Sequence, residues 1–209
     1  MDYSQALNED QLKAVTHVDG PLLILAGAGS GKTRALTYKA AYLLDDHRIP
    51  PEGLLLMTFT NKAAHEMQER LRALVGFRLP FAGTFHSFCA KLLRRYGQTL
   101  GIGNDFVIYD TQDQLQVLKG IYKRLSLDPK TLKIGSSLHA ISSAKNELIS
   151  PLEYASFARG GVQRDIAVIY KAYNEQLRSN HALDFDDLLV ESVNLLQENE
   201  ALDVYKRQA

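Results

Sequence analysis

The stretch Leu22-Leu23-Ile24-Leu25-Ala26-Gly27-Ala28-Gly29-Ser30-Gly31-Lys32-Thr33 is an apolar run that ends in a glycine-rich loop. The apolar run predicts a strand over 22–26, buried on both faces of a parallel sheet. The residues behind the loop predict a helix from about Gly31 to Leu44. Such glycines let the backbone turn tightly, so that its N–H groups and the positive end of the helix surround an anion. Residues 22–44 therefore predict a phosphate-binding strand, loop and helix.

The loop predicts a site for ATP and Mg²⁺. Lys32 would reach the β- and γ-phosphates, and the hydroxyl of Thr33 would hold Mg²⁺. The strict pattern begins with glycine where this chain has Ala26, a small residue that the permissive neighbouring glycines accommodate. The alternative is a glycine-rich turn with a solvated Lys32. The predicted nucleotide-binding residues are Gln11, Ala26, Gly27, Ala28, Gly29, Ser30, Gly31, Lys32, Thr33 and Arg34, of which Lys32 and Thr33 are the catalytic candidates.

The composition describes an ordinary globular protein of 209 residues, with 45 % hydrophobic and 23 % charged residues. Its 24 basic and 24 acidic residues cancel, so any nucleic-acid site must be local. No apolar run approaches the ~20 residues of a membrane span, and the start lacks a secretory leader. The single cysteine, Cys89, excludes an internal disulfide and a cysteine-rich zinc site. We expect a cytoplasmic protein with no membrane partner.

Strands and helices alternate in the first half of the chain. Further strands are predicted over 54–60 and 81–85, each followed by a helix, which is typical of an α/β parallel sheet with helices on both faces. Beyond about Tyr96 one short apolar run, 106–109, precedes a series of helices over 112–125, 132–148, 152–158, 165–178 and 185–197. We therefore expect an α/β nucleotide-binding unit followed by a helical unit, with the boundary within 91–105.

Four segments, in order, resemble the N-terminal part of superfamily 1 DNA helicases of the UvrD/Rep type. They are Leu7-Asn8-Glu9-Asp10-Gln11, residues 26–33, Thr58-Phe59-Thr60-Asn61-Lys62-Ala63-Ala64 and Gly83-Thr84-Phe85-His86-Ser87-Phe88. The later Leu183-Asp184-Phe185-Asp186-Asp187-Leu188-Leu189 also looks like the sequence that precedes the family's second ATPase motif. The resemblance implies a partial RecA-like ATP-binding core over 1–95, a helical insertion over 96–190 and the start of a return to the core over 191–209.

The resemblance implies that the first segment recognises adenine and that the third and fourth contact single-stranded DNA. The amide of Gln11 could match adenine, although Asn8 and Gln11 also fit a simple helix cap. Strand ends with hydroxyl, amide and ammonium groups suit a phosphodiester backbone, and Phe59 could stack on a base. A helix cap with a buried Phe59, or a core histidine at His86, is the structural alternative. The predicted DNA-binding residues are Phe59, Thr60, Asn61, Lys62, Thr84, Phe85 and His86.

The resemblance implies the N-terminal part of an ATP-dependent helicase that moves along single-stranded DNA and unwinds duplexes at single-strand/duplex junctions, in DNA repair or replication. One alternative is a compact nucleoside triphosphatase or kinase in which Asp110, after the 106–109 run, is the acidic magnesium partner. Asp110 also suits a helix cap, and Asp186 and Asp187 follow no predicted strand. A non-catalytic nucleotide-binding module is a further alternative. Because the family's aspartate–glutamate motif and second core domain are absent, we expect a truncated chain that binds ATP but scarcely hydrolyses it.

Overall fold

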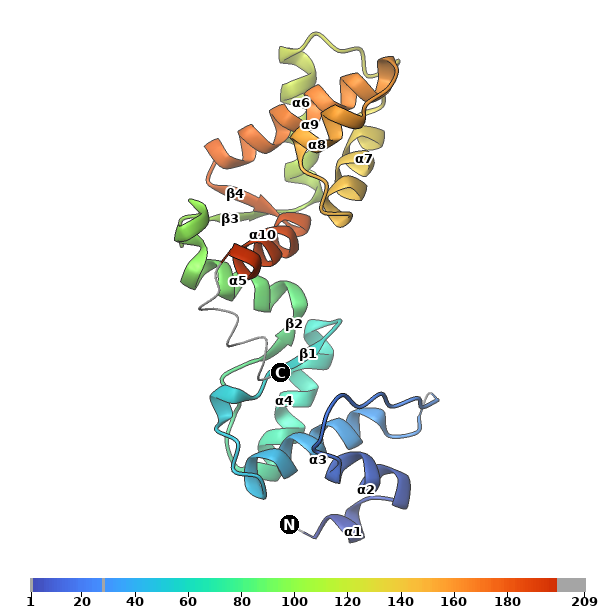
Figure 1. The fold of residues 1–209 in the computed structure, drawn as a ribbon, viewed down its shortest axis with the longest axis vertical. Helices are drawn as coiled ribbons and strands as arrows, with labels where there is room; N and C mark the ends of the chain where they lie inside the picture. The colour runs from blue at the N-terminus through green and yellow to red at the C-terminus, as the bar shows by residue number, and fades with distance from the viewer. Residues whose placement is uncertain (1, 28, 199–209) are drawn as a thin grey trace. The chain divides into compact units, whose positions relative to one another are not determined.

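The computed structural model describes residues 2–27 and 29–198, which form two compact units of mixed α/β structure (Figure 1). The first unit comprises the described residues up to Phe88, and the second begins at Cys89. Helix α5, Phe85–Tyr96, contains this boundary. Within the described residues, no helix is both long and apolar enough to cross a bilayer.

The first unit contains a two-stranded parallel sheet and four α-helices before α5. The sheet pairs β1 with β2, with Leu56 opposite Ala82 and Thr58 opposite Thr84. Helices α3 and α4 pack against it around Met67 and Leu71, which are almost fully buried. The elements are α1 (Tyr3–Ala6), α2 (Glu9–Thr16), α3 (Lys32–Asp45), the 3-10 turn η1 (Pro51–Gly53), β1 (Leu56–Thr58), α4 (Asn61–Val75) and β2 (Ala82–Thr84).

The predicted strand over 22–26 is wrong for this structure. The segment has no regular secondary structure, and the side chains of Leu23 and Leu25 are 81 % and 87 % exposed. A central strand needs hydrogen-bonded neighbours at its edges. In the described part of the chain, β1 and β2 pair only with each other, and no backbone hydrogen bond joins 22–26 to another segment. An apolar run predicts burial, but it does not supply the neighbouring strands that would cover it.

The second unit is mostly helical, and its core joins α6, α7 and α9. Leu118, Tyr122, Ile169 and Tyr173 are almost fully buried in this core. The elements are η2 (Gly97–Leu100), β3 (Val107–Tyr109), α6 (Thr111–Arg124), α7 (Ile134–Asn146), α8 (Pro151–Phe157), α9 (Gly161–Ser179), β4 (Ala182–Asp184) and α10 (Phe185–Glu198). These helices confirm the predicted series to within four residues at each end.

The sequence prediction missed β4. This buried strand pairs in parallel with β3, with Ile108 opposite Leu183. A three-residue strand between two long helices gives almost no periodic signal, so the sequence pattern predicts no strand there. The described residues thus hold two separate two-stranded parallel sheets, and one larger sheet with helices on both faces is not formed within them.

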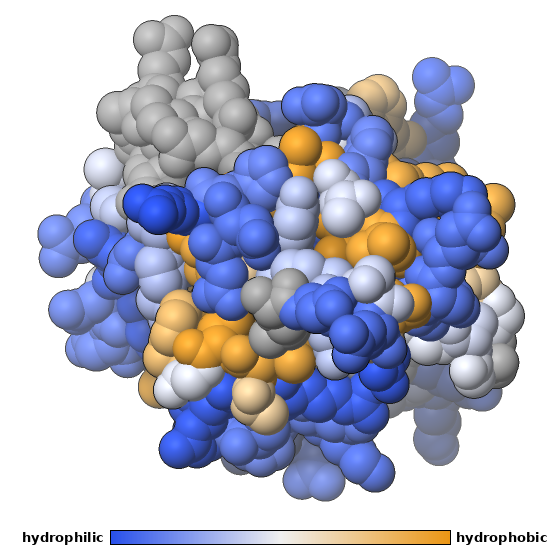
Figure 2. Space-filling model, turned by 90° about the horizontal axis from the view of Figure 1, so that it is seen from below, coloured by the Kyte–Doolittle hydropathy of each residue, from blue (hydrophilic) through white to orange (hydrophobic). Residues whose placement is uncertain are grey.

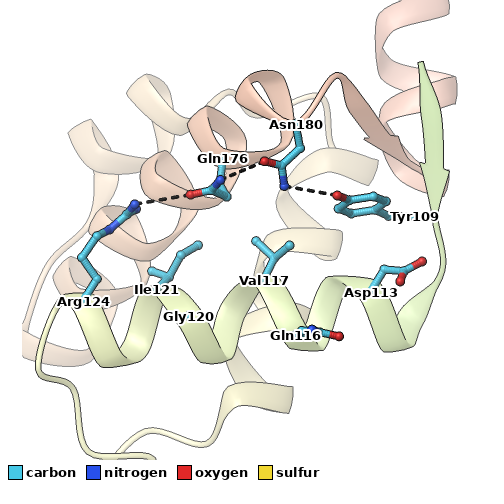
Figure 3. A pocket seen from close by; sticks show the side chains of 9 residues that line it. All are labelled: Tyr109, Asp113, Gln116, Val117, Gly120, Ile121, Arg124, Gln176 and Asn180. Carbon is cyan, nitrogen blue, oxygen red and sulfur yellow. Dashed lines mark hydrogen bonds between the residues drawn. The ribbon is translucent and has the colours of Figure 1, made fainter. Parts of the chain in front are cut away.

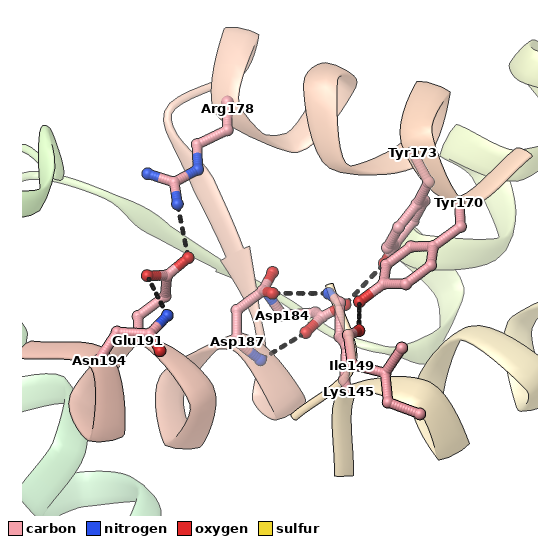
Figure 4. Close-up of polar contacts among 9 residues, drawn as sticks. All are labelled: Lys145, Ile149, Tyr170, Tyr173, Arg178, Asp184, Asp187, Glu191 and Asn194. Atoms are coloured by element: carbon pink, nitrogen blue, oxygen red, sulfur yellow. Dashed lines mark hydrogen bonds and ion pairs between the residues drawn. The ribbon is translucent and has the colours of Figure 1, made fainter. Parts of the chain in front are cut away.

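A buried charge cluster fixes the corner between β4 and α10 (Figure 4). The ammonium of Lys145 lies 2.7 Å from Asp184 Oδ2 and 2.6 Å from Asp187 Oδ1, and these side chains are 2 %, 1 % and 6 % exposed. Asp184 and Asp187 also accept each other's backbone N–H, at 2.8 and 3.1 Å, which caps α10. The hydroxyl of Tyr173 donates to Asp184 Oδ2 at 2.9 Å. We call Lys145, Asp184, Asp187 and Tyr173 the buried charge cluster.

Apolar side chains also reach the surface, and Figure 2 shows orange patches of them among hydrophilic residues on one face. Most exposed apolar side chains are single and need no explanation. Phe59 stands out, because 94 % of its surface is accessible.

Candidate nucleotide site and DNA interface

Helix α3 begins at the glycine-rich loop without a side-chain cap. Its N-cap residue is Gly31, and its first backbone bond runs from Ala35 N–H to Gly31 O at 2.9 Å. By contrast, Asn8, Thr60 and Asp110 cap α2, α4 and α6 through their side chains. The first N–H groups of α3 therefore have no side-chain acceptor, and the helix dipole makes this end electropositive. This end of α3 can accept an anion.

Two glycines of the loop adopt backbone conformations that other residues rarely adopt. Gly29 has φ 77° and Gly31 has φ 86°. A Cβ at Gly31 would also lie 2.5 Å from Nε2 of Gln11. Glycine at 31 is thus favoured by its backbone angle, and its missing side chain leaves room for the amide of Gln11. Ala28 lies outside the described residues.

The side chain of Lys32 folds back onto the loop. Its Nζ donates to the carbonyl oxygens of Ala26 and Gly27, at 2.7 and 2.6 Å. These neutral acceptors hold the ammonium over the loop, where a phosphate oxygen would make a stronger, charge-assisted bond. Thr33 follows on the first turn of α3 and is exposed. The residues present are therefore compatible with a bound phosphate group, and the predicted roles of Lys32 and Thr33 stay predictions.

Gln11 joins helix α2 to the loop. Its Oε1 accepts the N–H of Asn8 at 3.3 Å, and Asn8 Oδ1 accepts the N–H of Gln11 at 2.8 Å, so the helix-cap interpretation is confirmed. Its Nε2 donates to the carbonyl of Ser30 at 3.0 Å. The cap thus holds the Gln11 amide against the loop, and the predicted contact of Gln11 with adenine stays a prediction.

The side chain of Arg34 contacts other parts of the first unit rather than only solvent. Its Nη2 donates to the carbonyl of Ala6 at 2.8 Å, and its guanidinium lies 5.4 Å from the ring centroid of Tyr38. This arrangement ties α1 to α3. The predicted nucleotide contact of Arg34 stays a prediction.

The sheet brings the two predicted DNA-contact segments together. Because β1 and β2 are parallel and Thr58 pairs with Thr84, the residues that follow them emerge at the same edge. The rings of Phe59 and Phe85 lie with their centroids 6.3 Å apart, tilted by 46°. Phe59 is 94 % exposed and Phe85 is 45 % exposed, so the alternative with Phe59 in the core is wrong. The sequence predicts both rings as DNA contacts but not their pairing, which depends on the register of β1 against β2.

The polar residues at this edge are largely helix caps and first-turn residues. Thr60 Oγ1 accepts the N–H of Ala63 at 3.1 Å, and Asn61 and Lys62 are exposed on the first turn of α4. The helix-cap interpretation is therefore confirmed for Thr60. The N-terminal end of α4, with an exposed amide and ammonium, also presents donors suited to a phosphodiester.

The segment at the end of β2 and the start of α5 has the same arrangement. Thr84 Oγ1 accepts the N–H of Ser87 at 3.2 Å, and Ser87 Oγ donates to Thr84 O at 2.8 Å. His86 is half-buried on the first turn of α5. Both predicted segments thus place a capped helix start beside an exposed phenyl ring.

The aspartates considered as the acidic partner of a complete triphosphatase lie in the second unit, where Asp110 and Asp187 have partners within the chain. Asp110 Oδ1 accepts the N–H groups of Gln112 and Asp113, at 2.7 and 3.0 Å, so the cap interpretation is confirmed. The expectation that no strand precedes Asp186 and Asp187 is wrong, because β4 lies directly before them. Asp187 nevertheless pairs with a buried lysine rather than presenting its carboxylate to solvent.

Comparison with known proteins identifies the class. The chain belongs to the UvrD/REP helicase N-terminal domain family, whose model matches residues 7–209.

Among curated relatives, it is 45 % identical over 205 residues to the ATP-dependent DNA helicase PcrA of Bacillus subtilis. It is 43 % identical over 205 residues to PcrA of Staphylococcus aureus and of Staphylococcus epidermidis. Each match covers 97 % of this chain and 28 % of the relative, so the chain spans just over a quarter of those proteins.

Proposed function

We propose that this chain is the N-terminal part of an ATP-dependent DNA helicase that moves along single-stranded DNA and unwinds duplexes at single-strand/duplex junctions. The observation that carries the proposal is the uncapped start of α3 behind the glycine-rich loop, with Lys32 held over that loop. Family membership and the names of the relatives support the same function. A cytoplasmic place in DNA repair or replication fits a chain with a single cysteine.

In this proposal the nucleotide-binding residues are Gln11, Ala26, Gly27, Ala28, Gly29, Ser30, Gly31, Lys32, Thr33 and Arg34. Lys32 leaves its two carbonyl acceptors and donates to the β- and γ-phosphates, while the N–H groups of the first turn of α3 bind phosphate oxygens. Thr33 supplies a hydroxyl to Mg²⁺, which offsets phosphate charge when bound. Gln11 donates to, or accepts from, the adenine. Hydrolysis also needs an acidic residue that positions water.

The DNA-contact residues in this proposal are Phe59, Thr60, Asn61, Lys62, Thr84, Phe85 and His86. Phe59 and Phe85 offer ring faces to unpaired bases, and stacking of this kind does not depend on sequence. The N-terminal ends of α4 and α5 bind the phosphodiester backbone. Neither contact reads base edges, as movement along any sequence requires.

The proposal extends to the architecture. Residues 1–95 form part of a RecA-like core, 96–190 a helical insertion, and 191–209 the start of the return to the core. Within a complete parallel sheet, 22–26 becomes a strand, because neighbouring strands would pair its backbone and cover its apolar side chains. This would place the phosphate loop at the carboxyl end of that strand, where α/β sheets bind ligands.

The test is DNA-stimulated ATP hydrolysis by the full-length protein carrying Lys32→Ala. We expect the rate to fall by more than about 100-fold, because a charge aimed at the transferred phosphoryl group is lost. Lys13→Ala is the matched control, since Lys13 is an exposed lysine paired only with Glu9 on α2. If Lys32→Ala hydrolyses ATP as the control does, the loop is not the catalytic site and the proposal fails.

A further inference from the structure

The second unit carries a groove of about 450 Å³ that the proposed function does not use (Figure 3). It lies between α6 and the end of α9, next to Tyr109 at the end of β3. We call it the α6–α9 groove. Its volume lies within the range of ligand-binding clefts, which run from about 300 to 1,000 Å³.

One wall of the groove is a chain of hydrogen bonds between polar side chains. Arg124 Nη1 donates to Gln176 Oε1 at 3.4 Å, and Gln176 Nε2 donates to Asn180 Oδ1 at 3.0 Å. Asn180 Nδ2 then donates to the hydroxyl of Tyr109 at 3.2 Å (Figure 3). Each amide keeps one N–H and one carbonyl lone pair after these bonds. A peptide group has the complementary pair, one C=O and one N–H.

The floor of the groove is apolar. Figure 3 shows Val117 and Ile121 pointing from α6 towards α9, with Gly120 between them. Glycine inside a helix costs about 1 kcal/mol relative to alanine. A Cβ at Gly120 would have no atom within 4 Å, so the packing of the chain itself does not require glycine there. The missing side chain leaves room for the backbone of a bound molecule.

The charges at the two ends favour a peptide over a nucleic acid. Arg124 lies at one end, with one guanidinium N–H used by Gln176 and the others available. Asp113 lies at the other end, and its carboxylate accepts the N–H of Asp110 at 3.1 Å. A phosphodiester chain in the groove would meet the carboxylate of Asp113. A peptide can place one acidic side chain at Arg124 and nothing charged near Asp113.

The length of the groove indicates how many residues of a peptide it could hold. Asp113 and Arg124 are eleven positions apart on α6, which corresponds to roughly 16 Å along a helix. An extended peptide covers that distance with about five residues. We propose that the α6–α9 groove binds an extended peptide segment of about five residues, apolar in its middle, with an acidic side chain at the Arg124 end.

The test is a titration of the isotopically labelled full chain, followed by NMR of its backbone amides. The first probe is an acetylated, amidated pentapeptide of alternating leucine and alanine that ends in glutamate. The second probe has lysine in place of glutamate, and the third is a short oligothymidylate. We expect the glutamate peptide to shift the amides of α6 and the end of α9, with an affinity in about the millimolar range.

Three variants decide between specific and incidental binding. Arg124→Glu should weaken binding of the glutamate peptide by about tenfold and strengthen binding of the lysine peptide, because the charge at that end of the groove changes sign. Lys119→Glu, the same charge change at a position on α6 outside the groove, should leave both affinities unchanged. Gly120→Leu should abolish binding by filling the floor while the helix stays folded.

The proposal is overturned if neither peptide shifts these amides, or if Gly120→Leu binds as well as the parent chain. It is also overturned if Arg124→Glu and Lys119→Glu behave alike. Oligothymidylate that shifts the same amides and displaces the peptide would assign the groove to nucleic acid instead.

Discussion

Replacing Lys145 with methionine should destabilise the second unit more than any surface substitution. The change keeps the side-chain volume but leaves two carboxylates, Asp184 and Asp187, buried without a counter-ion. Breaking a buried ion pair in this way costs about 3–5 kcal/mol. We therefore expect the free energy of unfolding to fall by that amount at neutral pH.

The loss should depend on pH, because one lysine faces two carboxylates. Burial raises the pKa of Asp187 from 3.8 to about 6, although the charge of Lys145 opposes the shift. Burial acts to lower the pKa of Lys145, but the two carboxylates together outweigh it and raise that pKa. A carboxyl group whose pKa is higher in the folded state stabilises the fold fully when the pH is below its unfolded-state pKa. That contribution to the free energy of unfolding is lost as the pH rises through the folded-state pKa. Burial of Asp187 therefore destabilises the fold as pH rises towards about 6.

Without Lys145 the pKa of Asp187 should rise further, so the variant should keep losing stability above pH 6. The difference between parent and variant should thus be smaller at about pH 5 than at about pH 8, although Asp184 loses its partner in the variant at both pH values. The measurement is urea unfolding of the full chain by far-ultraviolet circular dichroism at both pH values. Lys171→Met is the control, since that lysine is 74 % exposed on α9.

A second variant isolates the charge. Adding Asp187→Asn to Lys145→Met should restore part of the lost stability at about pH 8, because one uncompensated charge is removed. A loss for Lys145→Met below about 1 kcal/mol, or one equal at both pH values, would refute the electrostatic explanation.

Three other predictions follow from local geometry. Phe59→Ala should weaken single-stranded DNA binding by the full-length protein by about 1–3 kcal/mol in a fluorescence titration, while Phe77→Ala should leave it unchanged. Gly31→Ala should lower nucleotide affinity measured by calorimetry, because the new Cβ would meet Gln11 and the backbone has φ 86°; equal affinity would contradict this. Leu148→Gly should raise the free energy of unfolding by about 0.5–1 kcal/mol, since Leu148 is exposed with φ 58°, and a fall would show that its side chain matters.

The helices could be predicted from the sequence because each carries its own signals. Helix α4 has a threonine cap at Thr60, buried residues at helical spacing such as Met67 and Leu71, and Gly76 with φ 84° at its end. These determinants are local, so a single sequence contains them. The glycine-rich loop is local in the same sense, because Gly29 and Gly31 adopt positive φ angles that glycine readily accommodates.

Strands and contacts between distant residues could not be predicted in this way. The run over 22–26 has the composition of a buried strand, but a strand exists only with its hydrogen-bonded neighbours. Strand β4 has only three residues and depends on pairing with β3. The pairing of Lys145 with Asp184 joins residues 39 positions apart, and no periodicity indicates it. The predicted place of Asp187 at the start of a helix is confirmed, while the reason for its burial lies on another helix.

The distribution of helix caps indicates which part of the molecule should respond to ligands. A side-chain cap contributes about 1 kcal/mol, and α2 and α4 in the first unit each have one, whereas α3 does not. If the proposed nucleotide site is correct, the start of α3 gains its partners when the phosphates bind, and nucleotide would then stabilise the folded first unit by mass action. In the second unit the start of α10 is instead stabilised by a side-chain cap and by the buried counter-ion Lys145, so it does not depend on a ligand. Saturating nucleotide should accordingly slow amide exchange in α3 but not in α10, and equal protection of both helices would show that the start of α3 is not the anion site.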